Sequence, residues 1–159
     1  MTDDKPRLAA LNARTIGEIS RTGYPEPYRQ AVAGRHWRAL GDAFGLKNFG
    51  VNLVRLAPGA ASSQRHWHTK EDELVYVLDG TPTLVTDAGE QLLAPGMVAG
   101  FPAGKADGHH LVNRSDRDVL FLTIGDRNDA DECEYPGLDL AVRVVDGKQR
   151  FTRKDGTPY

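Results

Sequence analysis

Two clusters of histidine constrain this chain more than any other feature. Four of its five histidines stand in His66-Trp67-His68 or in His109-His110, and the acidic residue Glu73 follows the first cluster. Histidine is the commonest metal ligand in proteins, through a neutral ring nitrogen. Side chains alternate between the two faces of a β-strand, so a strand would point His66 and His68 the same way. A lone histidine is ordinarily a hydrogen-bonded core or surface residue, but this grouping with an acid indicates a metal site.

The first cluster resembles a known motif. Gly59, His66, His68, Glu73 and Gly80 follow one another with a spacing similar to that of the first motif of the cupin superfamily. The gap between Gly59 and His66 is one residue longer than in the commonest form of that motif. The resemblance implies a small β-barrel that holds a metal ion through three histidines and one glutamate. It says much about fold and metal and little about the reaction.

The second cluster lies in a segment, Gly96 to Asn113, that resembles the second cupin motif. Carried over residue by residue, the resemblance implies four metal ligands: His66, His68, Glu73 and His109. His109 and His110 are adjacent, so on a regular strand only one of them can face the metal. The three-residue spacing to Asn113 favours His109. The preceding loop is two residues longer than usual, and a bulge at Gly108 would aim His110 at the metal instead.

Three imidazoles and one carboxylate imply one divalent metal ion per chain. These ligands suit zinc, iron, manganese, nickel or copper and do not choose among them. A six-coordinate ion would keep two positions for substrate, water or oxygen, whereas a four-coordinate zinc would be closed and structural. An accessible metal can polarise a carbonyl as a Lewis acid or lower the pKa of bound water toward ~7.

Four further polar residues are candidate catalytic or substrate-binding groups: Gln64, Tyr76, His110 and Arg55. By strand parity Gln64 shares the face of His66, whereas Tyr76 stands on the face opposite to Glu73. Each of the four also has an ordinary structural explanation. The single cysteine, Cys133, lies outside both motifs, so catalysis by cysteine is not expected.

Short apolar runs between glycine and proline turns indicate an all-β fold. Together with the resemblance they predict a cupin double-stranded β-helix, a jelly-roll barrel with an N-terminal extension, in one domain. Residues 1–48 are expected to form the extension and to pack on the barrel. Residues 49–125 are expected to form the barrel core with both motifs, and residues 126–159 a loop and hairpin that complete the same domain.

Individual strands are predicted at residues 49–56, 62–69 and 73–78, and in a hairpin at 140–145 and 149–153. The strand from Glu73 is apolar on both faces, which indicates that it is largely buried. The hairpin is predicted because Asp146-Gly147 is a dipeptide favoured in type I′ turns. Residues 28–46 are ambiguous, since their apolar residues could form a short helix that several glycines weaken.

The amino-acid composition limits which kinds of partner and which cellular location are expected. The chain has 20 Lys+Arg against 22 Asp+Glu, a balance that offers no argument for nucleic acid or an anionic membrane. Residues 1–14 do not resemble a signal peptide, and no apolar run approaches the ~18 residues of a membrane span. One cysteine fits a reducing compartment. We therefore expect a cytoplasmic protein that binds a small molecule and, like small one-barrel cupins, forms a homodimer.

Two classes of function fit these features. The first is a metal-dependent enzyme that acts on a small oxygenated molecule as an isomerase, lyase or dioxygenase, and the resemblance includes cupins similar to sugar-phosphate isomerases and dioxygenases. The second is a non-catalytic cupin that binds or senses a small molecule. A complete ligand set favours the enzyme, whereas the lack of an obvious acid–base partner favours the binding protein. An acid–base group within hydrogen-bond reach of an open metal position would separate the two.

Overall fold

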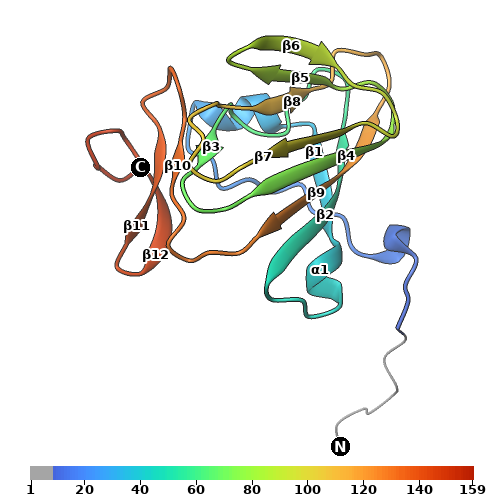
Figure 1. The fold of residues 1–159 in the computed structure, drawn as a ribbon, viewed down its shortest axis with the longest axis horizontal. Helices are drawn as coiled ribbons and strands as arrows, with labels where there is room; N and C mark the ends of the chain where they lie inside the picture. Colours follow the sequence, from blue (N-terminus) through green and yellow to red (C-terminus); the bar gives the residue numbers. More distant parts are fainter. Residues whose placement is uncertain (1–8) are drawn as a thin grey trace, which may run out of the picture.

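Antiparallel strands account for nearly all of the regular structure (Figure 1). The structure is a computed structural model, and residues 9–159 are described. Helical segments in this range are short: η1 (Ala13–Thr15), η2 (Tyr28–Val32) and α1 (Leu40–Ala43). The expected all-β class is therefore confirmed. Within residues 9–159 no helix has the length and apolar content needed to span a bilayer.

The strands form three sheets. The largest sheet has the order β1 (Arg35–Ala39), β2 (Phe49–Leu56), β9 (Val119–Asp126), β4 (Glu73–Asp79), β7 (Val98–Phe101). A second sheet has the order β6 (Gly89–Leu92), β5 (Thr83–Thr86), β8 (His110–Val112). A third sheet has the order β12 (Lys148–Thr152), β11 (Ala141–Val145), β10 (Cys133–Glu134), β3 (Trp67–His68). In Figure 1 the second sheet lies across the first, and the third lies at one side.

The main core lies between the first two sheets, because alternate residues of their strands point inward. Val75 and Val77 of β4 and Phe121 of β9 are buried there, and Leu84 of β5 and Leu111 of β8 pack against them. A smaller buried cluster joins the third sheet to the N-terminal segment through residues that include Tyr24, Val32, Tyr135 and Leu140.

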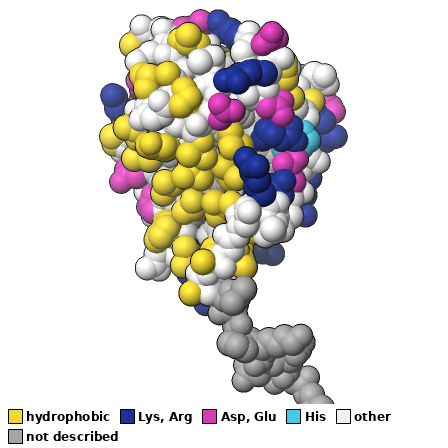
Figure 2. All heavy atoms as spheres, turned by 90° about the vertical axis from the view of Figure 1, so that its right-hand side faces the viewer, with side chains coloured by type: hydrophobic (Ala, Val, Ile, Leu, Met, Phe, Trp, Pro, Cys, Tyr) yellow, Lys and Arg dark blue, Asp and Glu magenta, His cyan; other side chains and the backbone are white. Residues whose placement is uncertain are grey.

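The predicted burial of both faces of β4 is wrong. Leu74, Tyr76 and Leu78 expose 39%, 40% and 41% of their surface. They stand on the outer face of the five-stranded sheet, and no described element of the chain covers that face. Hydrophobic side chains form a broad patch on the face of the molecule shown in Figure 2. Apolar residues on both sides of a strand predict burial only if something packs on each side, and within residues 9–159 the outer side of β4 stays partly exposed.

The ambiguous N-terminal segment contributes to the sheet. Within residues 28–46, β1 pairs in antiparallel register with β2, from Arg35 opposite Leu56 to Ala39 opposite Asn52. The only α-helix of this segment is the single turn α1. Residues 35–39 alternate between two sheet faces, and this pattern explains why a helical pattern was indistinct in the sequence.

The strand predicted at residues 62–69 is mostly irregular, since only Trp67 and His68 form β3. Before β3, an isolated bridge pairs His66 with His109 through two backbone hydrogen bonds of 3.2 and 2.9 Å. Other backbone groups of this stretch bond to the N-terminal segment, and Ala61 N donates to Ala31 O at 2.9 Å. The backbone of this stretch therefore bonds to distant segments of the chain and does not form a continuous β-strand.

The C-terminal hairpin is confirmed. β11 and β12 pair around Asp146 and Gly147, whose φ angles are 52° and 72°. Two successive positive φ values are what a type I′ turn requires, and glycine and aspartate tolerate them better than other residues.

Candidate metal centre

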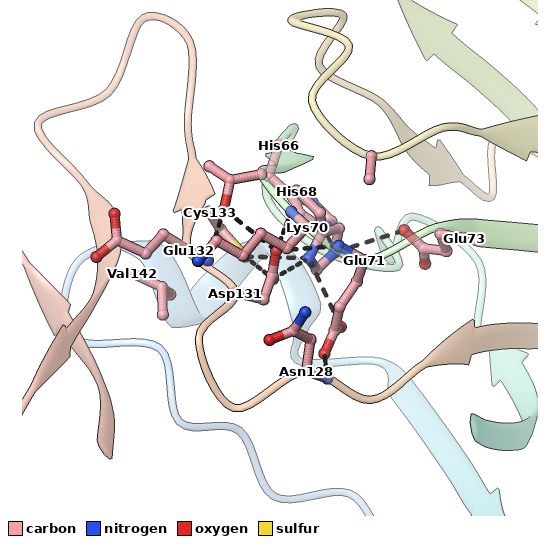
Figure 3. Close-up of polar contacts among 12 residues, drawn as sticks. His66, His68, Lys70, Glu71, Glu73, Asn128, Asp131, Glu132, Cys133 and Val142 are labelled. Atoms are coloured by element: carbon pink, nitrogen blue, oxygen red, sulfur yellow. Dashed lines mark hydrogen bonds and ion pairs between the residues drawn. The ribbon is translucent and has the colours of Figure 1, made fainter. Parts of the chain in front are cut away.

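Three histidines and one glutamate from four places in the chain meet beside the core. His66 precedes β3, His68 belongs to β3, Glu73 opens β4 and His109 directly precedes β8. The Nε2 atoms of His66 and His68 are 3.1 Å apart, and His109 Nε2 lies 2.8 Å from Glu73 Oε2. His68 Nε2 lies 3.7 Å from the same carboxylate oxygen. Figure 3 shows His66, His68 and Glu73 turned toward one another.

The donor atoms of this cluster suit a divalent metal ion. His66, His68 and Glu73 each bring one donor atom within 4.8 Å of the other two. Mixed imidazole and carboxylate donors are the usual ligands of zinc and of first-row transition metals. These three residues could therefore hold an ion, and His109 adjoins them through Glu73.

Protonation in the cluster favours metal binding. Burial lowers the pKa of His66 to about 4, so the imidazole is neutral at physiological pH. Burial alone would raise the pKa of Glu73, but the hydrogen bond from His109 and the neighbouring imidazoles lower it to about 2. A neutral imidazole and an ionised carboxylate are the forms that bind metals, so neither group needs to lose a proton first.

Aromatic rings hold two of the imidazoles in place. The ring of Phe101 stacks on His109 with 3.5 Å between centroids and an interplanar angle of 1°. The ring of Tyr135 stacks on His66 with 5.6 Å between centroids. His109 is 3% exposed, and among the described atoms its Nδ1 has no hydrogen-bond partner. Stacking on Phe101 and the contact of Nε2 with Glu73 therefore orient this ring.

Asp131 is a residue of the centre that sequence reasoning missed. Its Oδ2 lies 2.7 Å from His68 Nδ1, on the side of the ring away from the other ligands. Asp131 is 1% exposed, and its Oδ1 accepts hydrogen bonds from the backbone of Lys70 at 2.7 Å and of Glu71 at 3.2 Å. A carboxylate in this position keeps the proton on Nδ1 and leaves Nε2 as the donor to a metal. In the sequence Asp131 stands in a stretch expected to form a loop after the barrel core, and nothing in its spacing connected it with the histidines.

Cys133 also lies closer to the centre than the sequence indicated. Its Sγ is 3.4 Å from His68 Nδ1 and 3.8 Å from Asp131 Oδ2. His68, Asp131 and Cys133 form a second compact group on the far side of the His68 ring (Figure 3). Burial strongly raises the pKa of the Cys133 thiol, so it stays protonated and packs as a small apolar side chain.

The structure turns His110 and Gln64 away from the cluster. His110 Nδ1 lies 2.9 Å from the carbonyl oxygen of Ser63. The Gln64 side chain donates to the carbonyl oxygen of Tyr28 at 2.8 Å and so ties the N-terminal segment to the loop before β3. Strand parity does not apply to Gln64, because residues 62–66 are not a strand.

Arg55 and Tyr76 also lie outside the cavity. Arg55 forms ion pairs with Glu18 at 2.6 Å and with Asp118 at 3.0 Å on the outer side of the sheet. Tyr76 stands on the exposed apolar face of β4. We call His66, His68, Glu73 and His109 the ligand cluster. None of the four candidate catalytic residues lines the cavity next to it.

That cavity, called here the barrel cavity, has a volume of about 300 Å³. His66, Glu73 and His109 form part of its wall, and core residues such as Val75, Leu111 and Phe121 form the apolar part. The remaining polar groups in the wall come from residues outside the ligand cluster: Tyr24, Arg35, Asn52, Ser62, Ser63 and Thr123. A small polar molecule could thus reach the ligand cluster through hydroxyl, amide and guanidinium groups.

The fold and this cluster define a class, the small β-barrel proteins with a histidine- and carboxylate-lined centre. Residues 52–125 match the family model of the cupin domain. The crystal structure of a sugar phosphate isomerase of the cupin superfamily from Silicibacter pomeroyi is 44% identical, with 94% of this chain and 96% of that chain covered and a TM-score of 0.89. The chain belongs to the cupin superfamily, and the jelly-roll prediction is confirmed.

Two further solved structures are less similar to this chain. A candidate sugar phosphate isomerase from Acidithiobacillus ferrooxidans is 32% identical over 80% of this chain and 82% of that chain, with a TM-score of 0.71. A polyketide cyclase from Streptomyces resistomycificus is 21% identical over 76% of this chain and 80% of that chain, with a TM-score of 0.62, which shows a shared fold only. No curated protein sequence matches this chain.

Chelated protein is expected to lose stability as the pH falls from about 6.5 toward 4. Burial lowers the pKa of His66 from 6.5 to about 4, so between these values the unfolded chain binds a proton there and the folded chain does not. The free energy of unfolding therefore falls with pH, by at most about 1.4 kcal/mol per pH unit for this group. Thermal melts of the chelated protein across this range measure the effect. His66→Gln should flatten the profile, and an equally steep profile in this variant would contradict the assignment.

Proposed function

We propose that this chain is a metal-dependent isomerase of small phosphorylated sugars. The observation that carries the proposal is that His66, Glu73 and His109 meet on the wall of a cavity with polar and apolar groups, with His68 directly beside them. A volume of about 300 Å³ lies at the lower end of the range for small-molecule sites. The choice of reaction rests on the 44% identity, over 94% of this chain, with the sugar phosphate isomerase from Silicibacter pomeroyi.

In this proposal His66, His68, Glu73 and His109 hold one divalent ion. When bound, such an ion supplies Lewis-acid polarisation of a carbonyl or hydroxyl oxygen. The ionised Glu73 carboxylate offsets part of the ion's charge, and the stacked rings of Phe101 and Tyr135 keep two imidazoles oriented. Asp131 fixes the ring of His68 from behind.

The other cavity groups would hold the sugar. Burial raises the pKa of Tyr24, so its hydroxyl stays protonated at neutral pH and can donate a hydrogen bond to a substrate oxygen. Asn52, Ser63 and Thr123 add neutral donors and acceptors suited to sugar hydroxyls. Aldose–ketose isomerisation moves one proton between neighbouring carbons and one between their oxygens, so it needs no oxidant or reductant. The apolar part of the wall excludes bulk water while those protons move.

The test is proton exchange at carbon. The purified protein is loaded in turn with manganese, iron, nickel and zinc and incubated with aldose and ketose phosphates in deuterated water. We expect interconversion of aldose and ketose, with deuterium in the product seen by NMR, and loss of both after chelation. Glu73→Gln serves as the inactive control. No exchange with any metal, from protein that contains the metal, would reject the isomerase.

A non-catalytic binding protein is the second candidate. One observation favours it: apart from residues of the ligand cluster, no described residue in the cavity wall carries a carboxylate or an imidazole. A general base would then have to come from the cluster itself or from water. Tight binding of a sugar phosphate without exchange in the experiment above would establish this alternative.

We also propose that a second copy of the chain covers the outer face of the five-stranded sheet. Val98, Tyr76, Leu122 and Leu53 follow one another in register across four strands of that face. The next row carries Leu74, Ile124 and Val51, again without a charge. Charged residues border this apolar area, because Arg38 stands next to Leu53 in the first row and Arg55 pairs with Glu18 and Asp118 beyond it. An apolar area with a charged border fits an identical surface, and a two-fold axis pairs such faces in homodimers.

Sedimentation is expected to show a dimer of the 17.4 kDa chain. Introducing charge at two exposed positions, Tyr76→Glu with Val98→Glu, should give a folded monomer, because each carboxylate would be buried without a partner in the interface. A matched double variant on the surface of the third sheet, Gln149→Glu with Lys148→Glu, should leave the dimer unchanged. A monomer for the unaltered protein at high concentration would contradict this proposal.

The proposal places the protein in the cytoplasm. One buried cysteine with a raised pKa gives no disulfide and no reactive thiol, which suits a reducing compartment. Fractionation of cells that express the chain, followed by detection of the protein in each fraction, tests this location.

A further inference from the structure

Arg35 places a guanidinium group inside the barrel cavity. On β1, Arg35 stands opposite Leu56 of β2, and Trp37 stands opposite Val54. Leu56 and Val54 belong to the buried core, so this face of β1 points inward. Arg35 lines the same cavity as His66, Glu73 and His109. Arginine is rarely found inside a barrel without a partner, so its surroundings bear on its role.

One edge of this guanidinium has no acceptor among residues 9–159. Nη1 donates to the carbonyl oxygen of Ser62 at 2.8 Å, and the guanidinium carbon lies 4.9 Å from the centre of the Trp37 ring. Nε is buried without a hydrogen-bond partner, whereas Nη2, which also donates to none of the described atoms, is not fully buried. No carboxylate of the described residues comes within 4.0 Å of Arg35. The edge formed by Nε and Nη2 is therefore unpaired.

A half-buried cation without a partner is costly to desolvate, and no side chain among residues 9–159 supplies an anion to offset it. Burial lowers the pKa of Arg35, but an arginine remains charged at physiological pH. The outward-facing arginine of the same strand is different, since Arg38 is paired with Glu18 and bonds to the carbonyl oxygen of Ile16. The lack of an acid is thus particular to the arginine that faces the cavity.

We propose that Arg35 binds an oxyanion group of the molecule that occupies the barrel cavity. The Nε–Nη2 edge of a guanidinium matches two oxygens of a phosphate or a carboxylate, which form two parallel charge-assisted hydrogen bonds with it. The ligand cluster lies in the wall of the same cavity, so one end of a small molecule would meet Arg35 while its oxygens reach the cluster. This inference rests on the proposed function for the identity of the ligand as a sugar phosphate, but it concerns binding and not turnover.

The test compares three small probes of similar size: glycerol 3-phosphate, glycerate and glycerol. Their dissociation constants are measured by calorimetry on the metal-loaded full chain. We expect both anions to bind more tightly than glycerol, and the tighter of the two identifies phosphate or carboxylate as the preferred group. Arg35→Met keeps an unbranched side chain similar to the aliphatic part of arginine and removes the guanidinium charge. It should weaken the preferred anion by about 10- to 100-fold, the usual effect of losing hydrogen bonds to a charged group.

Two controls separate recognition from structure. Arg38→Met makes the same chemical change on the outward face of β1 and should leave anion affinity unchanged. Metal content of Arg35→Met, measured by elemental analysis, should match the unaltered protein. If Arg35→Met does not fold, Arg35→Lys replaces it in the test. This variant keeps the positive charge but cannot form two parallel hydrogen bonds, so it should show a smaller loss of affinity, and only for the anions.

Three outcomes would overturn the inference: no binding of either anion, equal loss of affinity for glycerol and the anions, or unchanged anion affinity in the Arg35 variants. These results are independent of catalysis. Absence of isomerisation with Arg35-dependent anion binding rejects the proposed reaction and leaves the oxyanion site standing. Isomerisation without Arg35-dependent anion binding does the reverse.

Discussion

Replacing His109 by alanine is expected to remove most of the bound metal, whereas replacing His110 by alanine should leave the metal content near normal. His109 Nε2 lies 2.8 Å from Glu73 Oε2 in the ligand cluster, while His110 Nδ1 bonds to the carbonyl oxygen of Ser63. Four-ligand zinc sites contribute about 10–16 kcal/mol, so loss of one of four ligands should weaken binding on the order of 100-fold or more. Elemental analysis after extensive dialysis gives the metal content of each variant.

The control for this pair concerns folding. His109 is buried and stacks on Phe101, so His109→Ala also leaves a small cavity. Glu73→Gln removes a charge with little change in volume and should lose metal as well, although less of its packing is disturbed. A His110→Ala protein without metal beside a loaded His109→Ala protein would show that the ligand assignment, and the family spacing behind it, is wrong.

Replacing Asp131 by alanine is expected to weaken metal binding by about 10- to 100-fold, the usual effect of removing the hydrogen-bond partner of a metal-binding histidine. Asp131 contacts His68 Nδ1 at 2.7 Å and also accepts hydrogen bonds from the backbone of Lys70 and Glu71. Burial opposes ionisation of Asp131, but the bonds from His68 and Lys70 hold its pKa below the ordinary value. The ionised carboxylate is therefore the form that orients the ring.

Two measurements separate orientation of His68 from a general loss of stability. In the chelated protein, nitrogen NMR should show His68 with its proton on Nδ1, and Asp131→Ala should shift the ring toward the other tautomer. Asp131→Asn keeps the size of the side chain and can still accept from Nδ1, so it should bind metal better than Asp131→Ala. Equal metal affinity in Asp131→Ala and the unaltered protein, or an unchanged tautomer, would contradict the role given to Asp131.

Much of the architecture follows from local sequence rules. Turn residues such as Asp146-Gly147 require particular φ values, and alternation within β2 and β9 suits a sheet with one buried face. These rules depend on neighbours in the chain, so the strand at 49–56 could be predicted closely. The burial of β4 could not, because apolar residues on both faces of a strand predict full burial only if other residues cover both faces, and the outer face of β4 stays partly exposed.

Parts of the candidate site could likewise be predicted from the sequence, and other parts could not. The sequence shows the types and the spacing of four candidate ligands, and the fold brings their side chains together: His66, His68, Glu73 and His109. Strand parity misplaced Gln64, because the stretch before β3 bonds to the N-terminal segment and is not a strand. A parity rule holds only where a regular strand forms, and the formation of that strand depends on distant partners.

The sequence by itself determined the types and spacing of the candidate metal ligands and the barrel that carries them, since these depend on side-chain chemistry and local backbone preference. Only the tertiary structure decided what surrounds the ligands. Asp131 is 63 residues from His68 in the chain and 2.7 Å from it in space. Arg35 faces the cavity without an acid, while Arg38 on the same strand has one. Hydrogen bonds and ion pairs act over a few ångströms, so these roles arise only when packing brings distant segments within that range.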